Sequence, residues 1–232
     1  MLEVRHLAAR YGPAQILFDI NFNVGTGEVV TLLGRNGMGK TTTINTLMGL
    51  VTATGGTAAF GGRPLLGLPP HRIARAGLGL VPEGRQIFPT LTVEENLIAT
   101  AAARGTDAPW TLSRVYEFFP RLAERRRNMG DQLSGGEQQM LAIGRTLMIN
   151  PKLLILDEAT EGLAPLVRQE IWSCLRRLKE DGQSILVVDK NLDALMKLAD
   201  RHVVIEKGHV VWTGSSALLA VDPTVRTRYL QA

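Results

Sequence analysis

The sequence is poor in cysteine, in aromatic residues and in long apolar runs, and each shortage excludes a class of protein. Cys174 is the single cysteine among 232 residues, so the chain can form neither an internal disulfide nor a zinc cluster of several thiolates. Aromatic residues make up 5%, too few for an obvious base-stacking platform. Apolar runs such as Val29 to Leu33 are far shorter than the ~20 residues that span a bilayer. We therefore expect a chain that does not cross a membrane.

The remaining composition is that of a globular protein with a sizeable core. Hydrophobic residues make up 45% and charged residues 21%, which is typical of a folded domain. The formal charge of +4 suits a polyanionic partner, but the basic residues are scattered, which favours solvated helix faces over a nucleic-acid surface. The opening residues Met1 to Arg5 lack a basic segment leading into an apolar run. We therefore expect no secretory signal and a cytoplasmic location.

Strand-like and helix-like segments alternate along the chain. Apolar and β-branched runs bounded by turn residues predict strands at 2–7, 20–24, 28–33, 153–156, 185–188 and 202–206. Apolar residues at helical spacing predict helices from residue 40 to about 49 and at 93–103, 112–119, 136–148 and 166–179. This alternation indicates an α/β fold with a parallel sheet that is covered on both faces.

A phosphate-binding loop stands between the third predicted strand and the first helix. Its pattern of glycine, four free positions, glycine, lysine and threonine is met by Gly34, Arg35, Asn36, Gly37, Met38, Gly39, Lys40 and Thr41, and Thr42 follows. Backbone N–H groups of such a loop surround a polyphosphate, and the helix N-terminus adds its positive dipole. Lys40 is expected to neutralise the β and γ phosphates, and the Thr41 hydroxyl to bind magnesium. The alternative is a glycine-rich turn capped by a threonine.

Two adjacent acids end an apolar run and complete the predicted phosphate chemistry. Asp157 and Glu158 follow the run Leu153 to Leu156, and ligands of open α/β sheets collect at such strand ends. We assign Asp157 to the metal shell and Glu158 as general base, or orienter, of the water that attacks the γ-phosphate. The alternative is a solvated strand end.

The segment Leu133 to Gln139 resembles the signature sequence of ATP-binding cassette proteins, with Ser134, Gly135, Gly136 and Glu137 at its centre. This resemblance implies a P-loop NTPase with a RecA-like, mostly parallel core, an N-terminal antiparallel β subdomain and a helical insert. It also implies one nucleotide-binding domain over 1–232, with a catalytic core at 1–90 and 150–232 and a helical signature subdomain at about 91–149. The implied cofactors are ATP and Mg²⁺, and the signature of one subunit caps the ATP of another. Ser134 also fits a helix N-cap, which is compatible with that role.

Further residues are placed by the same resemblance. Tyr11 matches the aromatic that stacks on adenine, although a packed turn residue is an alternative. Glu83 stands where the family usually has a magnesium-linked glutamine, and a glutamate also binds this metal. Lys190 occupies the place of a switch histidine, where it meets the γ-phosphate or is an exposed lysine at a helix start. Ala164 replaces a common aspartate, which leaves communication across the dimer open.

Four segments are similar to the smaller ATPase of bacterial branched-chain amino acid importers: 81–85, 91–97, 161–165 and 189–191. The resemblance implies a second related ATPase, two membrane permeases and, indirectly, an extracytoplasmic binding protein as partners, with the chain on the cytoplasmic face of the inner membrane and no nucleic acid bound. ATPases of urea and short-amide importers are very similar. Exporter ATPases and nucleic-acid-maintenance or translation-associated ATPases are the remaining alternatives.

Overall fold

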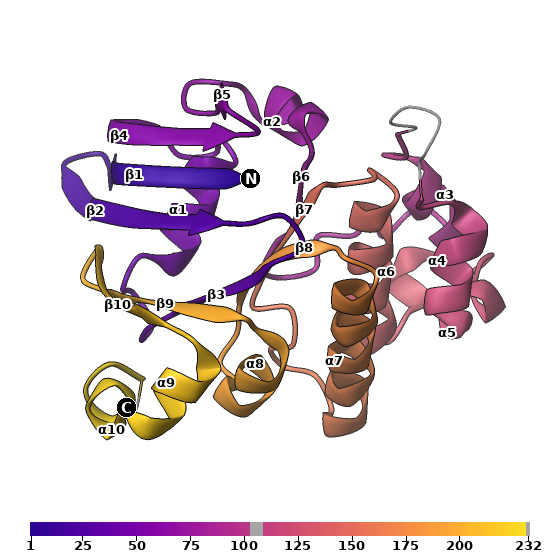
Figure 1. The fold of residues 1–232 in the computed structure, drawn as a ribbon. Helices are drawn as coiled ribbons and strands as arrows, with labels where there is room; N and C mark the ends of the chain where they lie inside the picture. The colour runs from indigo at the N-terminus through magenta and orange to yellow at the C-terminus, as the bar shows by residue number, and fades with distance from the viewer. Residues whose placement is uncertain (103–108, 231–232) are drawn as a thin grey trace.

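The computed structural model describes residues 1–102 and 109–230. Within them one mixed sheet runs in the order β5-β4-β1-β2-β10-β9-β3-β8-β7-β6 (Figure 1). The strands are Leu2–Tyr11 (β1), Ala14–Val24 (β2), Val29–Leu33 (β3), Ala53–Phe60 (β4), Arg63–Pro64 (β5), Leu78–Val81 (β6), Leu153–Asp157 (β7), Ser184–Val188 (β8), Arg201–Glu206 (β9) and His209–Gly214 (β10). The helices are Lys40–Leu47 (α1), Pro70–Ala76 (α2), Val93–Ile98 (α3), Leu112–Phe118 (α4), Pro120–Glu124 (α5), Gly135–Leu147 (α6), Pro165–Glu180 (α7), Leu192–Leu198 (α8), Ser216–Val221 (α9) and Pro223–Val225 (α10), with short turns Gly130–Gln132 (η1) and Arg226–Leu230 (η2).

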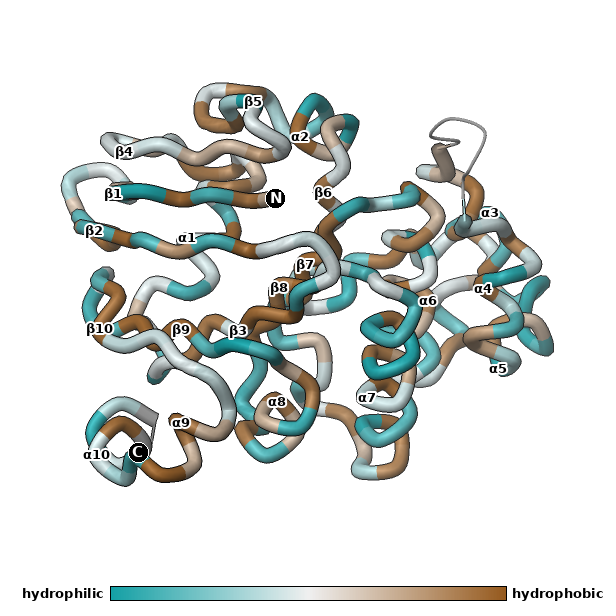
Figure 2. Tube along the Cα trace, in the orientation of Figure 1, coloured by the Kyte–Doolittle hydropathy of each residue, from teal (hydrophilic) through white to brown (hydrophobic). Residues whose placement is uncertain are grey.

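The parallel half of the sheet forms the centre of the molecule. Strands β6, β7, β8, β3 and β9 pair in parallel in that order, and β3, β7 and β8 are buried at every position. Figure 2 shows these central strands as hydrophobic segments. Strands covered on both faces need apolar residues on both faces, which explains why they occur in the sequence as uninterrupted apolar runs.

An antiparallel part curls away from this centre. Strands β1, β2, β4 and β5 pair antiparallel, with Leu2 opposite Val24 and Leu2 also opposite Phe60. Burial alternates over much of β1, as expected where one face meets the core and the other meets solvent. The predicted fold class, a mostly parallel core with an N-terminal antiparallel part, is therefore confirmed.

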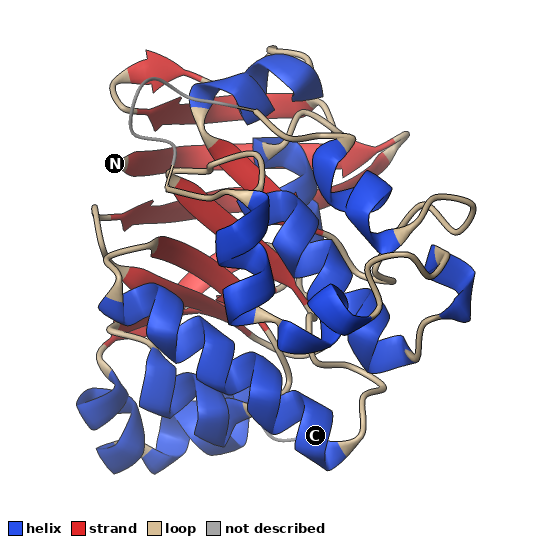
Figure 3. Cartoon of the chain, turned by 90° about the vertical axis from the view of Figure 1, so that its right-hand side faces the viewer, coloured by secondary structure: helices blue, strands red, loops and turns tan. Residues whose placement is uncertain are grey.

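Two apolar clusters lie on opposite faces of the central strands. In β3 the side chains of Val29 and Leu33 join the cluster that includes helices α3 to α8, whereas Val30 and Leu32 join the cluster that contains β1, β2 and α1. Successive side chains of a strand point to opposite faces, so one short strand contributes to both clusters. Figure 3 shows several helices lying over the strands. Among the described residues, no helix is long and apolar enough to cross a membrane.

Some elements differ from the sequence-based expectation. The helix predicted at 93–103 ends at Ile98, and residue 103 lies outside the described residues. Strand β4 was not predicted because Gly55 and Gly56 resemble a turn, yet they lie inside the strand. Gly56 has φ +82°, and a Cβ there would lie 2.2 Å from the carbonyl oxygen of His6. A glycine is required at this close approach to β1, although it weakens the local strand signal.

Candidate functional site

The glycine loop connects the carboxyl end of β3 with the start of α1. Gly34 has φ +140°, and a Cβ on it would lie 2.2 Å from the carbonyl oxygen of Ile205. Gly39 has φ +110° and is the N-cap of α1. These positions require glycine for steric and conformational reasons. The loop therefore presents backbone groups, rather than Cβ atoms, beside the N-terminus of an eight-residue helix.

Lys40 is held over this loop. Its Nζ donates hydrogen bonds to the carbonyl oxygens of Gly34 and Arg35, at 2.8 and 2.9 Å. Burial lowers the pKa of Lys40, and the nearby carboxylates of Glu158 and Asp157 oppose that shift. The ammonium thus lies where a phosphate on the loop would meet a positive charge.

Asp157 ends β7 and contacts the first turn of α1. The Thr41 hydroxyl donates to Oδ1 of Asp157 at 3.3 Å. Burial raises the pKa of Asp157, and the charge of Glu83 acts in the same direction, while the hydrogen bond from Thr41 lowers it. A hydroxyl and carboxylates are hard oxygen donors, which suits Mg²⁺. The donor set of Thr41, Asp157 and Glu83 therefore fits this cation.

Glu158 follows on a strained turn and belongs to a charged cluster. Its φ is +51°, a conformation that costs non-glycine residues energy and often occurs at functional sites. Lys190 Nζ lies 3.3 Å from Oε2 of Glu158 and also pairs with Glu161. Burial and the hydrogen bond to Glu161 raise the pKa of Glu158 to about 6, against the opposing effect of Lys190. Glu158 is consequently a stronger base than an ordinary glutamate and is still ionised at neutral pH.

Most of these groups line one cavity of about 520 Å³. Its walls include nine of the predicted site residues: Asn36, Gly37, Gly39, Lys40, Thr41, Thr42, Glu83, Glu158 and Lys190. Ligand oxygens of Glu83, Glu158 and Glu161 lie within 4.8 Å of one another, close enough to share a cation. The cavity thus combines a phosphate-sized loop, a base and a set of oxygen donors.

The other predicted site residues do not line this cavity: Tyr11, Gly34, Arg35, Met38, Ser134, Gly135, Gly136, Glu137 and Asp157. Gly34, Arg35 and Met38 belong to the loop itself, and Asp157 accepts a hydrogen bond from the cavity residue Thr41. Tyr11 is the last residue of β1 and is 49% exposed. Its ring is therefore available to a ligand, although it does not line the loop cavity.

The signature segment is built as a helix start apart from the loop. Ser134 caps α6: its Oγ accepts from the N–H of Glu137 at 3.3 Å, and its own N–H donates to the Glu137 carboxylate at 2.8 Å. A Cβ on Gly136 would lie 2.5 Å from a methyl group of Val167, so α6 starts tightly against α7. Ser134 and both glycines are not among the residues that line the loop cavity of their own chain.

Two cavity residues were missed from the sequence. Glu161 pairs with Lys190, and Ile16 in β2 supplies an apolar wall. A signal existed for Glu161, because it lies three residues after Glu158 in the same loop, whereas Ile16 has the pattern of an ordinary strand residue. The turn is also fixed by Asp189, which accepts from the Thr160 hydroxyl at 2.6 Å.

A family model for ABC transporters matches residues 17–161. The chain is also 43% identical, over 231 residues and 99% of each chain, to the high-affinity branched-chain amino acid transport ATP-binding protein BraG of Pseudomonas aeruginosa. The chain belongs to the ABC transporter family. As a member it is an ABC ATPase, and it shares 32% identity with the lipopolysaccharide export system ATP-binding protein LptB of Escherichia coli, over 99% of this chain and 96% of LptB. A solved ATP binding subunit of an ABC transporter superimposes with a TM-score of 0.81 at 28% identity, covering 98% and 92% of the two chains.

Proposed function

We propose that this ABC ATPase energises a bacterial importer of branched-chain amino acids, namely leucine, isoleucine and valine. The observation that carries the proposal is the 43% identity with BraG over nearly the full length of both chains. The four segments at 81–85, 91–97, 161–165 and 189–191, which resemble the smaller ATPase of such importers, support the same substrate class. The chain itself supplies energy and does not touch the amino acid.

The proposed chemistry is hydrolysis of ATP at the loop cavity. Backbone N–H groups of residues 34–39 and the N-terminus of α1 hold the phosphates, and Lys40 neutralises their charge. Thr41, Asp157 and Glu83 would hold Mg²⁺, which when bound offsets the negative charge that develops at the γ-phosphate. Glu158 orients the attacking water and accepts its proton. Lys190, placed 3.3 Å from Glu158, acts at the switch position beside that water.

The proposed active site needs two subunits. Ser134, Gly135, Gly136 and Glu137 lie outside the cavity of their own chain, which supports a role in capping the nucleotide of a partner ATPase. Tyr11 is proposed to stack on adenine from its exposed position. We further propose a catalytic core at 1–90 and 150–232, a helical signature subdomain at about 91–149, two membrane permeases as partners and an extracytoplasmic binding protein that delivers substrate. In this proposal the chain lies at the cytoplasmic face of the inner membrane.

The runner-up function is energising a urea or short-amide importer, because the same four segments suit those ATPases. The chain is 32% identical to the export protein LptB and 43% identical to BraG. Sequence identity therefore favours an importer over an exporter. Nucleic-acid-maintenance ATPases carry long coiled-coil inserts, and translation-associated ATPases usually have two phosphate loops. This sequence shows neither feature, which disfavours both roles.

Substrate uptake in cells lacking this chain tests the proposal. Labelled leucine, isoleucine and valine are supplied, with urea and glutamate as controls, and the cells carry wild type or Lys40→Ala. Loss of branched-chain uptake that wild type alone restores supports the proposal. Normal leucine uptake with lost urea uptake would move the chain to the amide importers. If all uptakes stayed normal, the importer assignment would be wrong.

A further inference from the structure

A second cavity, of about 730 Å³, lies at the opposite edge of the sheet from the nucleotide site. Its wall includes Lys152, directly before β7, and Ser184, the first residue of β8. The glycine loop and Asp157 instead lie at the carboxyl ends of the parallel strands. Amino and carboxyl ends of parallel strands lie at opposite edges, so this cavity is separate from the proposed ATPase chemistry.

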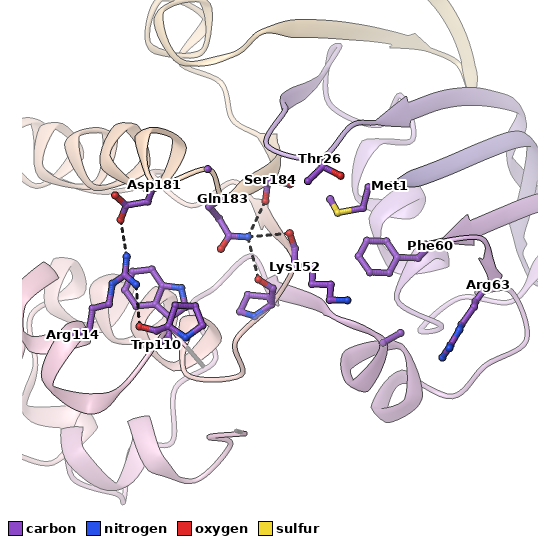
Figure 4. Close-up of a pocket in the computed structure, with 15 residues that line it drawn as sticks. Met1, Thr26, Phe60, Arg63, Trp110, Arg114, Lys152, Asp181, Gln183 and Ser184 are labelled. Atoms are coloured by element: carbon purple, nitrogen blue, oxygen red, sulfur yellow. Dashed lines mark hydrogen bonds and ion pairs between the residues drawn. The ribbon is translucent and has the colours of Figure 1, made fainter. Parts of the chain in front are cut away.

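Apolar surfaces face this cavity from two sides. Figure 4 shows Phe60 and Met1 on one side and Trp110 on the other. Phe60 ends β4, and Trp110 precedes α4, so distant parts of the sequence supply the two walls. Phe60 and Trp110 are each 5% exposed, which means that both are fixed by their neighbours and that only a small part of each borders the cavity.

The charges of the lining side chains favour an anion. Arg63, Arg114 and Lys152 line the cavity with one carboxylate, that of Asp181, so the side chains carry a formal charge of +2. Arg114 is neutralised by Asp181 at 2.8 Å and stacks 4.4 Å above the Trp110 ring. Within residues 1–102 and 109–230, Arg63 and Lys152 have no side-chain hydrogen bond or ion pair. The carboxyl end of α7 offsets about half a charge, which leaves the cavity positive.

The polar groups between the two walls are already hydrogen-bonded within the protein. The Gln183 side-chain amide donates to the carbonyl oxygens of Pro151 and Lys152, both at 3.2 Å, and the Ser184 hydroxyl accepts from the N–H of Gly27 at 2.8 Å. These groups fix the floor of the cavity. The available charge therefore comes from Arg63 and Lys152, the two cations that pair with none of the described residues, and not from the floor.

We propose that this cavity binds a small organic anion with an apolar body. Lys152 and Arg63 bind its anionic group, and its apolar body lies between Phe60 and Trp110. The volume falls in the range of about 300 to 1,000 Å³ typical of small-molecule sites. Because one wall precedes α4 and the other ends β4, the bound anion links two parts of the subunit at a distance from the nucleotide. This is a ligand site additional to the proposed ATPase function and does not depend on the transported substrate.

Calorimetric titration of the full chain with four probes tests the ligand class. Octanoate and n-octyl phosphate carry an apolar chain and an anion, octylammonium carries the same chain and a cation, and acetate carries the anion alone. Saturable binding of octanoate or octyl phosphate, at least tenfold tighter than that of octylammonium and acetate, is expected. The tighter of the two anionic probes identifies a carboxylate or a phosphate as the preferred group. Equal binding of octylammonium, or no saturation by either anionic probe, would overturn the proposal.

Charge reversal locates the binding. Lys152→Glu and Arg63→Glu are each expected to weaken octanoate and octyl phosphate binding at least tenfold. Arg72→Glu is the matched control, because Arg72 is an exposed cation on α2 that does not line the cavity. ATP binding by each variant verifies its fold, and Arg63 provides a second test should Lys152→Glu fail to fold. An equal loss in the Arg72 control, or no loss in a folded cavity variant, would contradict the assignment.

Discussion

His202 is expected to make the stability of this ATPase fall in mild acid. The side chain is fully buried on β9, where Nδ1 lies 2.7 Å from the Thr31 hydroxyl and Nε2 lies 2.8 Å from the Ser216 hydroxyl. Burial lowers the pKa of His202 from 6.5 to about 4. The folded protein thus keeps this imidazole neutral at pH values where the unfolded chain binds a proton.

The size of the effect follows from the difference between the two pKa values. Since the unfolded state binds more protons between about pH 6.5 and pH 4, the free energy of unfolding decreases as the pH falls through that window. Linkage with pKa values of 6.5 and about 4 gives a loss of about 2 kcal/mol between pH 8 and pH 5, and about 3 kcal/mol at pH 4. The contribution is fully present only well above pH 6.5, because half of the unfolded chains already carry the proton at that pH.

Urea unfolding of wild type and His202→Gln at pH 8, 6.5 and 5 measures this loss. Glutamine keeps a polar side chain at the position but does not titrate, so its overall stability can differ while its pH dependence lacks the His202 contribution. Other groups, including Glu158, titrate in both proteins and cancel in the comparison. Wild type should lose about 2 kcal/mol more than the variant from pH 8 to pH 5. Parallel losses in the two proteins would refute the assignment to His202.

Three further sets of substitutions test the site. Gly34→Ala places a Cβ against the Ile205 carbonyl and should cost about 2 kcal/mol or more in urea unfolding, whereas Gly37→Ala meets no atom within 4 Å and should cost less; equal costs would exclude the clash. Ser134→Ala should lower the free energy of unfolding by about 1 kcal/mol, because the helix loses its cap. Ser134→Asn should restore this stability without restoring ATP hydrolysis. Full recovery of hydrolysis in Ser134→Asn would leave the serine only its capping role. Asp157→Asn should weaken Mg²⁺ activation of ATP hydrolysis about 10- to 100-fold, and unchanged Mg²⁺ titrations would remove Asp157 from the metal site.

Much of the central fold was predictable because its signals are local. The run Val29 to Leu33, the glycine loop and the helix from Lys40 are consecutive in the sequence, and each has its own pattern. Strand β7 and its two terminal acids form a second local signal of the same kind. The strand order and the proximity of the glycine loop to the end of β7 are non-local features. Their proximity was nevertheless predictable, because a phosphate loop needs a carboxylate beside it to hold the metal.

The features that were missed depend on contacts between distant residues. Strand β4 is a strand because it pairs with β1, in spite of two internal glycines. Thr31 and His202 are 171 residues apart, and no periodic pattern connects them. The contact between Lys190 and Glu161 depends on how two loops end at the same edge of the sheet. Such pairings are settled by tertiary structure and not by local propensity.

The division into a catalytic core and a helical subdomain, and the roles assigned to single site residues, stay predictions. Helices α3, α4, α5 and α6 lie together beside the sheet in Figure 1, which is compatible with that division. Relative motion of the two parts in solution would give it direct support.

ATP turnover by the assembled transporter in proteoliposomes tests whether Glu158 drives the hydrolysis that powers leucine uptake. Wild-type subunit is compared with Glu158→Gln, with leucine-loaded binding protein outside, and both ATP hydrolysis and leucine uptake are followed. Glu158→Gln is expected to bind ATP normally but to lose hydrolysis about 10²- to 10⁴-fold, together with uptake, because it lacks the base that accepts the proton of water. Hydrolysis and uptake at wild-type rates in that variant would contradict this role of Glu158.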